Sequence, residues 1–397
     1  MAQEKTFAQI ESRYFWLLAA LGALVVGAGL YSAYFMESHG HVVTGMNNHV
    51  VWGMPHVFAI FMIVAASGVL NVASVGSVFG KHVYKARAPL AGLLSIALLA
   101  GGLTVLMLDL GRPDRIIVAL TNYNPTSMFA WNALLYSGLF TTVALYLWTL
   151  MEKRMNPWSK PMGFVVFGWR IILTTGTGLI FAFLVARQAY ASAILPPMFI
   201  VLSFAWGLAV FLIVQSAMFS WNELKLNPAI QQRMKNLLGV FIVGSLYLVA
   251  AYHLTNLYFA RESAFEHFIL VSGGIYPALF WGGYVVVGSA LPLLLIFTPG
   301  MGKGIHVLAA SLLTLAGAFA LLYVFIIGGE AFPLDIFPGY QVISSSFGDG
   351  QVASYAPSLP EIVLGTGGLA IAFMITIAGV RALNFLPHDD PKAVHQD

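Results

Sequence analysis

The sequence predicts an all-α integral membrane protein with about ten transmembrane helices. Of its 397 residues, 59% are hydrophobic and only 9% are charged, whereas a soluble domain carries about 25% charged residues. Apolar runs long enough to cross a bilayer, which takes about 20 residues, recur along the whole chain. Many of the 39 glycines lie inside these runs, and small residues allow membrane helices to pack closely. These observations favour a packed helical bundle.

We expect one polytopic domain covering residues 1–397. The expected spans lie near residues 15–36, 51–79, 89–109, 128–150, 163–186, 195–220, 236–259, 268–297, 305–328 and 361–382. The first run follows a polar segment and is long enough to span, so we interpret it as a retained helix rather than a cleaved signal. The runs at 51–79 and 268–297 exceed one bilayer thickness and should tilt or protrude. Pro277 and Pro292 are expected to kink the second of these runs.

The loop charges predict the orientation of the chain. Fourteen of the 19 basic residues lie on one side of the expected spans: Lys5, Arg13, Lys81, Lys85, Arg87, Lys153, Arg154, Lys160, Lys225, Arg233, Lys235, Lys303, Arg381 and Lys392. The other side holds Arg112, Arg115, Arg187 and Arg261, and Arg170 lies inside a span. The positive-inside rule makes the first side cytoplasmic. We therefore predict that both ends of the chain are cytoplasmic (N-in/C-in).

The composition excludes several kinds of site from this protein. It contains no cysteine, so it holds no disulfide, no iron–sulfur cluster and no Cys-based zinc site. The net charge of +3 comes from loop residues without a basic stripe, so we expect no nucleic acid partner. A secondary transporter should show broken helices or charges at mid-membrane. The expected spans offer little of either, and no acidic residue lies near the middle of one.

Three histidines raise the question of haem. His49 and His56 are seven residues apart, which puts them two turns apart on one helix face, and His253 lies in the outer half of the seventh span. Two histidines on different helices are able to ligate haem b. The alternative is that they are hydrogen-bonded core or interface histidines, which is the more common outcome. We therefore expect no haem b in this protein.

Polar residues gather in the connection between the third and fourth spans and in the helix after it. They are Asp109, Arg112, Asp114, Arg115, Asn122, Tyr123, Asn124, Trp131, Asn132 and Tyr136. One interpretation is an ordinary loop, in which Asp109 pairs with Arg112 at a helix end and aromatic residues form the interfacial belt. The other interpretation is a ligand site. The longest loop, 329–360, could cover a partner protein or be a disordered connection.

Two parts of this cluster carry a family resemblance. The segment Leu108-Asp109-Leu110-Gly111-Arg112-Pro113 is followed by Asn124-Pro125-x-Ser127-Met128-x-x-Trp131. The two parts at this separation, on the non-cytoplasmic side, resemble the signature of the NrfD/PsrC family of membrane subunits. The similarity in helix number and topology extends over nearly the whole chain. The stretch from Met46 to Gly53, MNNHVVWG, is similar to the DsrP branch of that family, found in the DsrMKJOP complex of dissimilatory sulfur metabolism.

The resemblance implies two four-helix bundles with flanking helices, in a bacterial or archaeal inner (cytoplasmic) membrane. It implies a quinone, menaquinone or ubiquinone, bound near the outer face close to a periplasmic ferredoxin-like iron–sulfur subunit. The other partners it implies are a multihaem cytochrome c, a haem b membrane subunit and a cytoplasmic iron–sulfur subunit. The protein would then be the subunit without metal in a quinone-linked oxidoreductase complex. The alternative is a passive membrane anchor without a working quinone site.

A quinone needs an apolar slot with a few polar groups at its oxygens, and its oxidation needs a proton acceptor. We expect Asp109 or His56 to accept protons, with Arg112 holding Asp109 ionised. The quinone-binding residues are expected to be Arg112, Tyr123, Trp131, Asn132 and Tyr136.

Overall fold

The computed structural model describes residues 12–78, 80, 82–221, 226–334, 340, 350–383 and 385. All regular elements in this part of the chain are helices, and ten of them are long and apolar enough to cross a membrane. The prediction of an all-α membrane protein with about ten spans is therefore confirmed. Lys5, Lys81, Lys225 and Lys392, and residues 335–339 and 341–349 of the loop at 329–360, lie outside the described residues.

The membrane-spanning helices run in chain order. They are α1 (Ser12–His39), α2 (Met54–Ser77), α3 (Ala88–Leu108), α5 (Met128–Met151), α6 (Ser159–Ala182), α7 (Leu195–Trp221), α8 (Pro228–Tyr258), the composite α10–η6–α11 (Ile275–Pro277, Ala278–Ala290, Leu291–Phe297), α12 with η7 and α13 (Ile305–Leu322, Tyr323–Gly328, Gly329–Ala331), and α14 (Leu359–Leu383). Short helices lie in the connections: η1 (His41–Val43), η2 (His82–Arg87), η3 (Pro113–Arg115), α4 (Ile116–Thr121), η4 (Lys153–Trp158), α9 (Ser263–His267) and η5 (Phe268–Ser272).

The stretch expected as one long span at 268–297 is divided in two. The π-helix η5 ends at Ser272, and the chain turns at Gly273 and Gly274 before α10 begins. Gly274 has a φ of 63°, a conformation that side chains disfavour. The residues before this turn therefore belong to a short helical segment, α9 and η5, of which α9 packs beside α8, and the stretch long and apolar enough to cross a membrane is Ile275–Phe297.

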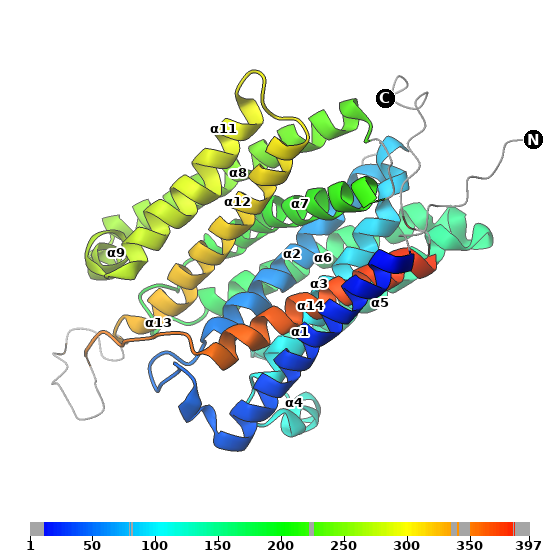
Figure 1. Cartoon of the computed structure of the whole chain (residues 1–397). Coiled ribbons are helices and arrows are strands. Elements are labelled where there is room, and N and C mark those ends of the chain that lie inside the picture. Colours follow the sequence, from blue (N-terminus) through cyan, green and yellow to red (C-terminus); the bar gives the residue numbers. More distant parts are fainter. Residues whose placement is uncertain are drawn as a thin grey trace, which may run out of the picture.

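Helix α2 lies at the centre of the molecule. Its most apolar window is entirely buried, and it packs mainly against α3 and α7, with further contacts to α6 and α14. Helices α5 and α6 pack on each other, α7 packs on α8 and α12, and α14 lies between α1 and α3. In Figure 1 the long helices run roughly parallel, and the start of α1 and the end of α14 lie at the same end of the bundle.

Glycine pairs bring helix backbones into direct contact. A Cβ added at Gly68 of α2 would overlap the carbonyl oxygen of Ser203 of α7, and one at Gly207 would overlap the backbone around Gly68. Gly288 and Gly317 approach each other in the same way between η6 and α12. Small residues at these crossings permit the close packing that stabilises helices in lipid, where burial of apolar surface gives no advantage.

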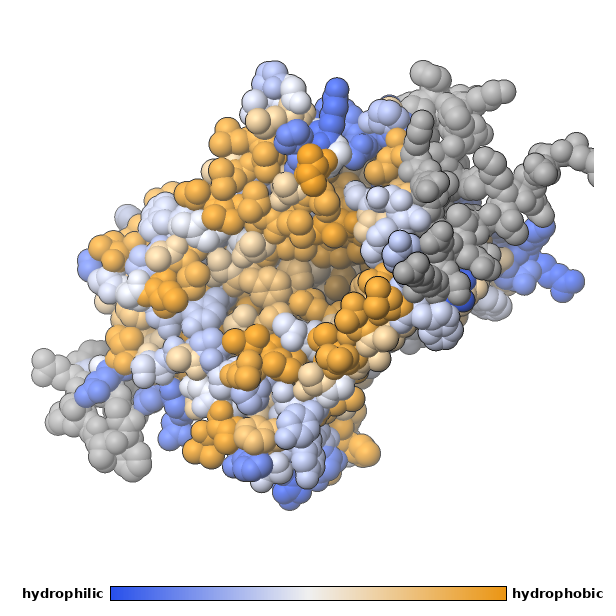
Figure 2. Space-filling model, in the orientation of Figure 1, coloured by the Kyte–Doolittle hydropathy of each residue, from blue (hydrophilic) through white to orange (hydrophobic). Residues whose placement is uncertain are grey.

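The outside of the bundle is apolar over its middle. In Figure 2 hydrophobic residues cover the centre of the visible face, and hydrophilic residues gather toward its ends. Helix α1 shows the pattern clearly, since Leu17, Leu21 and Leu24 are more than half exposed on it. An apolar belt of this kind fits a protein that spans a membrane several times.

Replacing Gly68 with Ala should destabilise the fold through the α2–α7 crossing. The added methyl group overlaps a backbone oxygen that cannot rotate away, and overpacking of this kind costs about 1–3 kcal/mol. The matched control is Gly27→Ala on α1, because no atom lies within 4 Å of the position of its Cβ. The thermal unfolding midpoint of purified protein should fall for Gly68→Ala and stay unchanged or rise for Gly27→Ala. Equal midpoints for the two variants would contradict the close crossing.

Candidate functional site

One end of the bundle collects most of the buried ionisable groups. Helices α2, α5, α7 and α14 begin at this end, and α3, α6, α8 and α13 end there. The residues gathered are Asp109, Arg187, His253, Glu266, Glu330 and Glu361, all of them buried or nearly so. Ionisable groups within membrane proteins are costly to bury and usually mark a functional site.

His56 and Asp109 form a direct pair. The Nδ1 atom of His56 lies 2.9 Å from Oδ2 of Asp109, and their side chains are 15% and 1% exposed. His56 is the third residue of α2, after Pro55 at the favoured start position, and Asp109 caps the C-terminus of α3. The pair therefore joins the start of α2 to the end of α3. The imidazole stays partly accessible to solvent, whereas the carboxylate is buried.

The positions of the pair make its charged form costly. The N-terminal end of a helix carries partial positive charge and the C-terminal end partial negative charge. His56 at the start of α2 therefore meets an unfavourable dipole when protonated, and Asp109 at the end of α3 meets one when ionised. Each effect is about 0.3–1 kcal/mol at an exposed helix end. Each charge of the pair would therefore lie at a helix end whose partial charge has the same sign.

Aromatic rings cover the pair. The indole of Trp52 stacks on the His56 imidazole, with centroids 5.8 Å apart and an angle of 20° between the planes. Phe129 of α5 and Phe181 of α6 meet the indole edge-on at 6.1 Å and 5.6 Å. These three rings bring α5 and α6 together with the start of α2 and form apolar walls beside one imidazole. This combination is expected for a site that binds a flat, mostly apolar ligand.

Glu330 fixes the segment that carries Trp52. Its Oε2 accepts the backbone N–H groups of Val51 and Trp52, each at 2.8 Å. Arg187 donates from Nη1 to the carbonyl oxygen of Glu330 at 2.8 Å and from Nη2 to the carbonyl oxygen of His49 at 2.9 Å. One carboxylate and one guanidinium thereby hold three distant parts of the chain in a single arrangement.

Glu361 anchors the earlier part of the same segment. Its Oε2 accepts the N–H groups of Gly45 at 2.8 Å and Ser358 at 2.7 Å, and its Oε1 accepts the Tyr355 hydroxyl at 2.7 Å. The Tyr355 oxygen in turn accepts the N–H of Met54. Burial, together with the bond to Glu361, raises the pKa of the Tyr355 phenol. Tyr355 therefore stays protonated and serves as a fixed donor.

The expected pair between Asp109 and Arg112 does not form. Arg112 binds Asp114 through two bonds of 3.0 Å, and these side chains are 65% and 60% exposed. The bond from Arg112 lowers the pKa of the Asp114 carboxyl. Gly111, at a φ of 23°, turns the backbone between Asp109 and Arg112, and Asp109 faces inward to His56 instead. Arg112 is thus placed at the surface rather than beside the buried carboxylate.

The other sequence-predicted residues divide into buried and exposed groups. Asn132 is buried and donates to the carbonyl oxygens of Met128 at 2.8 Å and Gly176 at 3.1 Å, while its Oδ1 is buried without a partner. Tyr136, one turn further along α5, is also buried. Tyr123 and Trp131 are about half exposed, and the Trp131 indole donates to the carbonyl oxygen of Pro125. The structure brings only His56 and Asp109 into direct contact with each other.

Trp52, Phe129, Phe181, Arg187, Glu330 and Glu361 were not predicted as site residues. Arg187 and Glu330 were visible in the sequence as charges at span ends, a signal of function in membrane proteins. Trp52 and Phe181 carried no such signal, because aromatic residues at span ends are common. Within the described residues, no group of three or more His, Cys, Asp or Glu side chains could hold a metal ion.

Known proteins are similar to this one over most of its sequence. The family described as polysulphide reductase, NrfD, matches residues 42–334, a range that includes His56, Asp109 and Glu330. The sequence is 29% identical to the Hdr-like menaquinol oxidoreductase integral membrane subunit of Archaeoglobus fulgidus, over 94% of both proteins. It is 23% identical to a subunit of the selenate reductase of Mesobacillus selenatarsenatis, over 98% of this protein and 97% of that subunit.

The sequence is also 23% identical to one polypeptide of the polysulfide reductase of Wolinella succinogenes, over 72% of this protein and 96% of that polypeptide. The family match covers well over half of the sequence and contains both parts of the motif around Asp109. The protein is a multi-pass integral membrane protein and belongs to the NrfD family of polysulphide reductase membrane subunits.

Proposed function

We propose that this protein is the quinone-interacting membrane subunit of a respiratory or sulfur-metabolism electron-transfer complex. It exchanges electrons between the membrane quinone pool and a partner iron–sulfur subunit on the periplasmic side. The observation that carries the proposal is the partly accessible His56 imidazole, backed by buried Asp109 and stacked on Trp52. The name of the Archaeoglobus relative, a menaquinol oxidoreductase subunit, favours menaquinone as the quinone.

The side chains present fit a quinone. The rings of Trp52 and of half-exposed Phe129 offer apolar faces that can pack against a flat ring system, and buried Phe181 supports the indole from behind. His56 offers a hydrogen-bonding nitrogen beside them, because Asp109 occupies only Nδ1. The unpartnered Oδ1 of buried Asn132 lies one turn from Phe129 along α5, and a buried acceptor without a donor costs about 1–3 kcal/mol. A quinol hydroxyl would satisfy it.

The chemistry of the site then follows from its acid–base groups. A bound quinol supplies electrons to the partner subunit and protons to this protein. His56 accepts a proton at Nε2, and Asp109 at Nδ1 stabilises the imidazolium and fixes the ring. Trp52 covers one face of the imidazole and keeps bulk water from it. Proton release from Nε2 toward the outer side returns the neutral imidazole beside the Asp109 carboxylate, so that His56 can accept the second proton of the quinol. The positive end of the α2 dipole favours this loss of charge from His56.

The family and the loop sequence suggest the setting of this reaction. We infer a DsrP-like subunit in a bacterial or archaeal inner membrane, next to a periplasmic ferredoxin-like subunit, a multihaem cytochrome c, a haem b membrane subunit and a cytoplasmic iron–sulfur subunit. The helix contacts support two four-helix bundles, formed by α2, α3, α5 and α6 and by α7, α8, α12 and the η6–α11 span, with α1 and α14 on the flank.

The Asp109→Asn variant should impair quinol oxidation. The amide keeps the shape of the carboxylate but no longer stabilises a protonated His56, so turnover should fall about 10²- to 10⁴-fold, the range for loss of acid–base catalysis. Quinone affinity should change less, by about two- to tenfold, as for one altered hydrogen bond. Quinol-dependent reduction of the partner clusters and quenching of intrinsic tryptophan fluorescence by a menaquinone analogue measure the two effects.

Asp114→Asn is the matched control for Asp109→Asn. It makes the same chemical change five residues away, on an exposed carboxylate that pairs only with Arg112 in the described structure. It should assemble and turn over like the wild type. If Asp109→Asn assembles and turns over equally well, the protein is better described as a passive anchor.

The charge pattern predicts that Val42 is outside and Asn156 is inside. The native sequence has no cysteine, and both positions are exposed in connections at opposite ends of the bundle. Val42→Cys should react with an impermeant maleimide in intact spheroplasts, whereas Asn156→Cys should react only after the membrane is permeabilised. The reverse labelling pattern would overturn the N-in/C-in orientation. Partner subunits that cover Val42 would block its labelling. Repeating the experiment in cells that express this protein alone removes this effect.

A further inference from the structure

A second buried pair of histidine and carboxylate lies in the other half of the molecule. The Nδ1 atom of His253 on α8 lies 2.6 Å from Oε2 of Glu266 on α9. Glu266 is fully buried, and His253 is 8% exposed. Asn256 completes the cluster by donating from Nδ2 to Oε1 of Glu266 at 2.8 Å. The function proposed for His56 and Asp109 makes no use of these residues.

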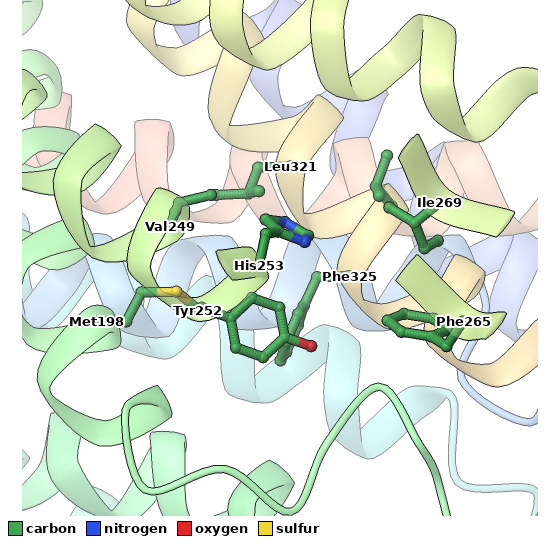
Figure 3. A pocket seen from close by; sticks show the side chains of 9 residues that line it. Met198, Val249, Tyr252, His253, Phe265, Ile269, Leu321 and Phe325 are labelled. Carbon is green, nitrogen blue, oxygen red and sulfur yellow. The ribbon is translucent and has the colours of Figure 1, made fainter. Parts of the chain in front are cut away.

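Cavities lie on both sides of this cluster. Asn256 lines an open cavity of about 360 Å³ between the connection from α6 to α7 and the end of α8 with the turn that follows it. His253 lines a smaller cavity of about 20 Å³ inside the bundle, together with Tyr252 and Phe325. Figure 3 shows the imidazole projecting from α8 among Val249, Leu321 and Phe325. The inner cavity has room for one water molecule, which needs about 10–15 Å³.

We propose that His253 and Glu266 form a proton-exchange site that is loaded from the outer cavity past Asn256. A hydronium ion in the outer cavity gives its proton to the pair and leaves behind a water molecule. The pair gains one positive charge and passes from net negative to neutral. The imidazole presents the proton at Nε2, the nitrogen that Glu266 does not contact, to the inner cavity that the ring lines. Release is the reverse of this step.

The burial of the pair explains why it binds a proton. An ionised carboxylate without a countercharge is very costly in an apolar interior. The walls around the ring are mostly apolar, from Met198 of α7, Phe280 of η6 and Leu321 of α12. The neutral, protonated pair is therefore the form that the surroundings favour, and water must reach it for the proton to exchange.

Other titratable and charged groups near the pair come from each neighbouring element. They are Tyr252 on α8, Tyr190 before α7, Tyr284 on η6, His267 on α9, and Arg261 and Glu262 in the turn between α8 and α9. Arg261 and Glu262 line the outer cavity and carry opposite charges. The phenols and the exposed His267 imidazole are neutral partners at most. Among the printed contacts of the Glu266 carboxylate, those with His253 and Asn256, the imidazole is the group that can carry a countercharge.

Infrared difference spectroscopy of the full-length protein in lipid nanodiscs tests the proposal. We expect carboxyl and imidazole bands that change together when the bulk pH is varied. These bands should shift in heavy water. They should be lost in Glu266→Gln and kept in the control Glu262→Gln, whose carboxylate lies on the wall of the outer cavity. Asn256→Leu, which replaces the amide with an apolar group, should slow the deuterium shift several-fold.

His253→Gln and Asn256→Leu keep the test informative if Glu266→Gln fails to fold. His253→Gln preserves a hydrogen-bond donor toward Glu266 and should remove the imidazole band. The carboxyl band should stay, but without the pH response that it shares with the imidazole in the wild type. A pair that neither titrates nor exchanges with deuterium in the wild type would overturn the proposal, and the contact would then only fasten α9 to α8. Exchange at the wild-type rate in Asn256→Leu would overturn the route through the outer cavity.

Discussion

The bond between the Glu330 carboxylate and the backbone of Val51 and Trp52 holds the rest of the site in place. Val51 and Trp52 are 279 and 278 positions from Glu330 in the sequence. The bond therefore connects the start of α2, in the first expected bundle, to the end of the ninth span. Without it, the backbone N–H groups of Val51 and Trp52, in partly buried surroundings, would lose their acceptor. Trp52 would then no longer be fixed over His56, and the imidazole would lose its cover. Arg187, in the connection after α6, secures the same corner by binding the carbonyl oxygens of His49 and Glu330.

Two imidazole–carboxylate pairs lie at the same end of the bundle, and aromatic rings pack continuously between them. From Trp52 the contacts run through Phe181 and Phe325 to Tyr252, with centroids 5.6 Å, 5.0 Å and 6.3 Å apart. These packed rings separate the two pairs within one core. The first pair faces aromatic walls suited to a ligand, and the second faces cavities suited to water.

The sequence predicted the fold well because membrane spans depend on local composition, and it predicted the site only in part. His56 and Asp109 were singled out by residue type and by the motif, but Asp109 was given the wrong partner. A neighbour three residues away is the natural guess from sequence, whereas the actual partner, His56, lies on another helix. The roles of Glu330 and Glu361 depend on backbone amides brought from distant loops. No spacing in the sequence encodes such contacts, since any residue other than proline supplies a backbone N–H.

Photolabelling with an azido derivative of menaquinone tests the central claim most directly. The account places the ring of the quinone beside His56 and the aromatic residues Trp52, Phe129 and Phe181. After illumination of the purified complex and digestion, the label should be found on peptides containing residues 50–58 or 128–132, and excess unmodified menaquinone should compete it away. Competed labelling found only on other helices, with none on these two segments, would contradict a quinone site at this pair.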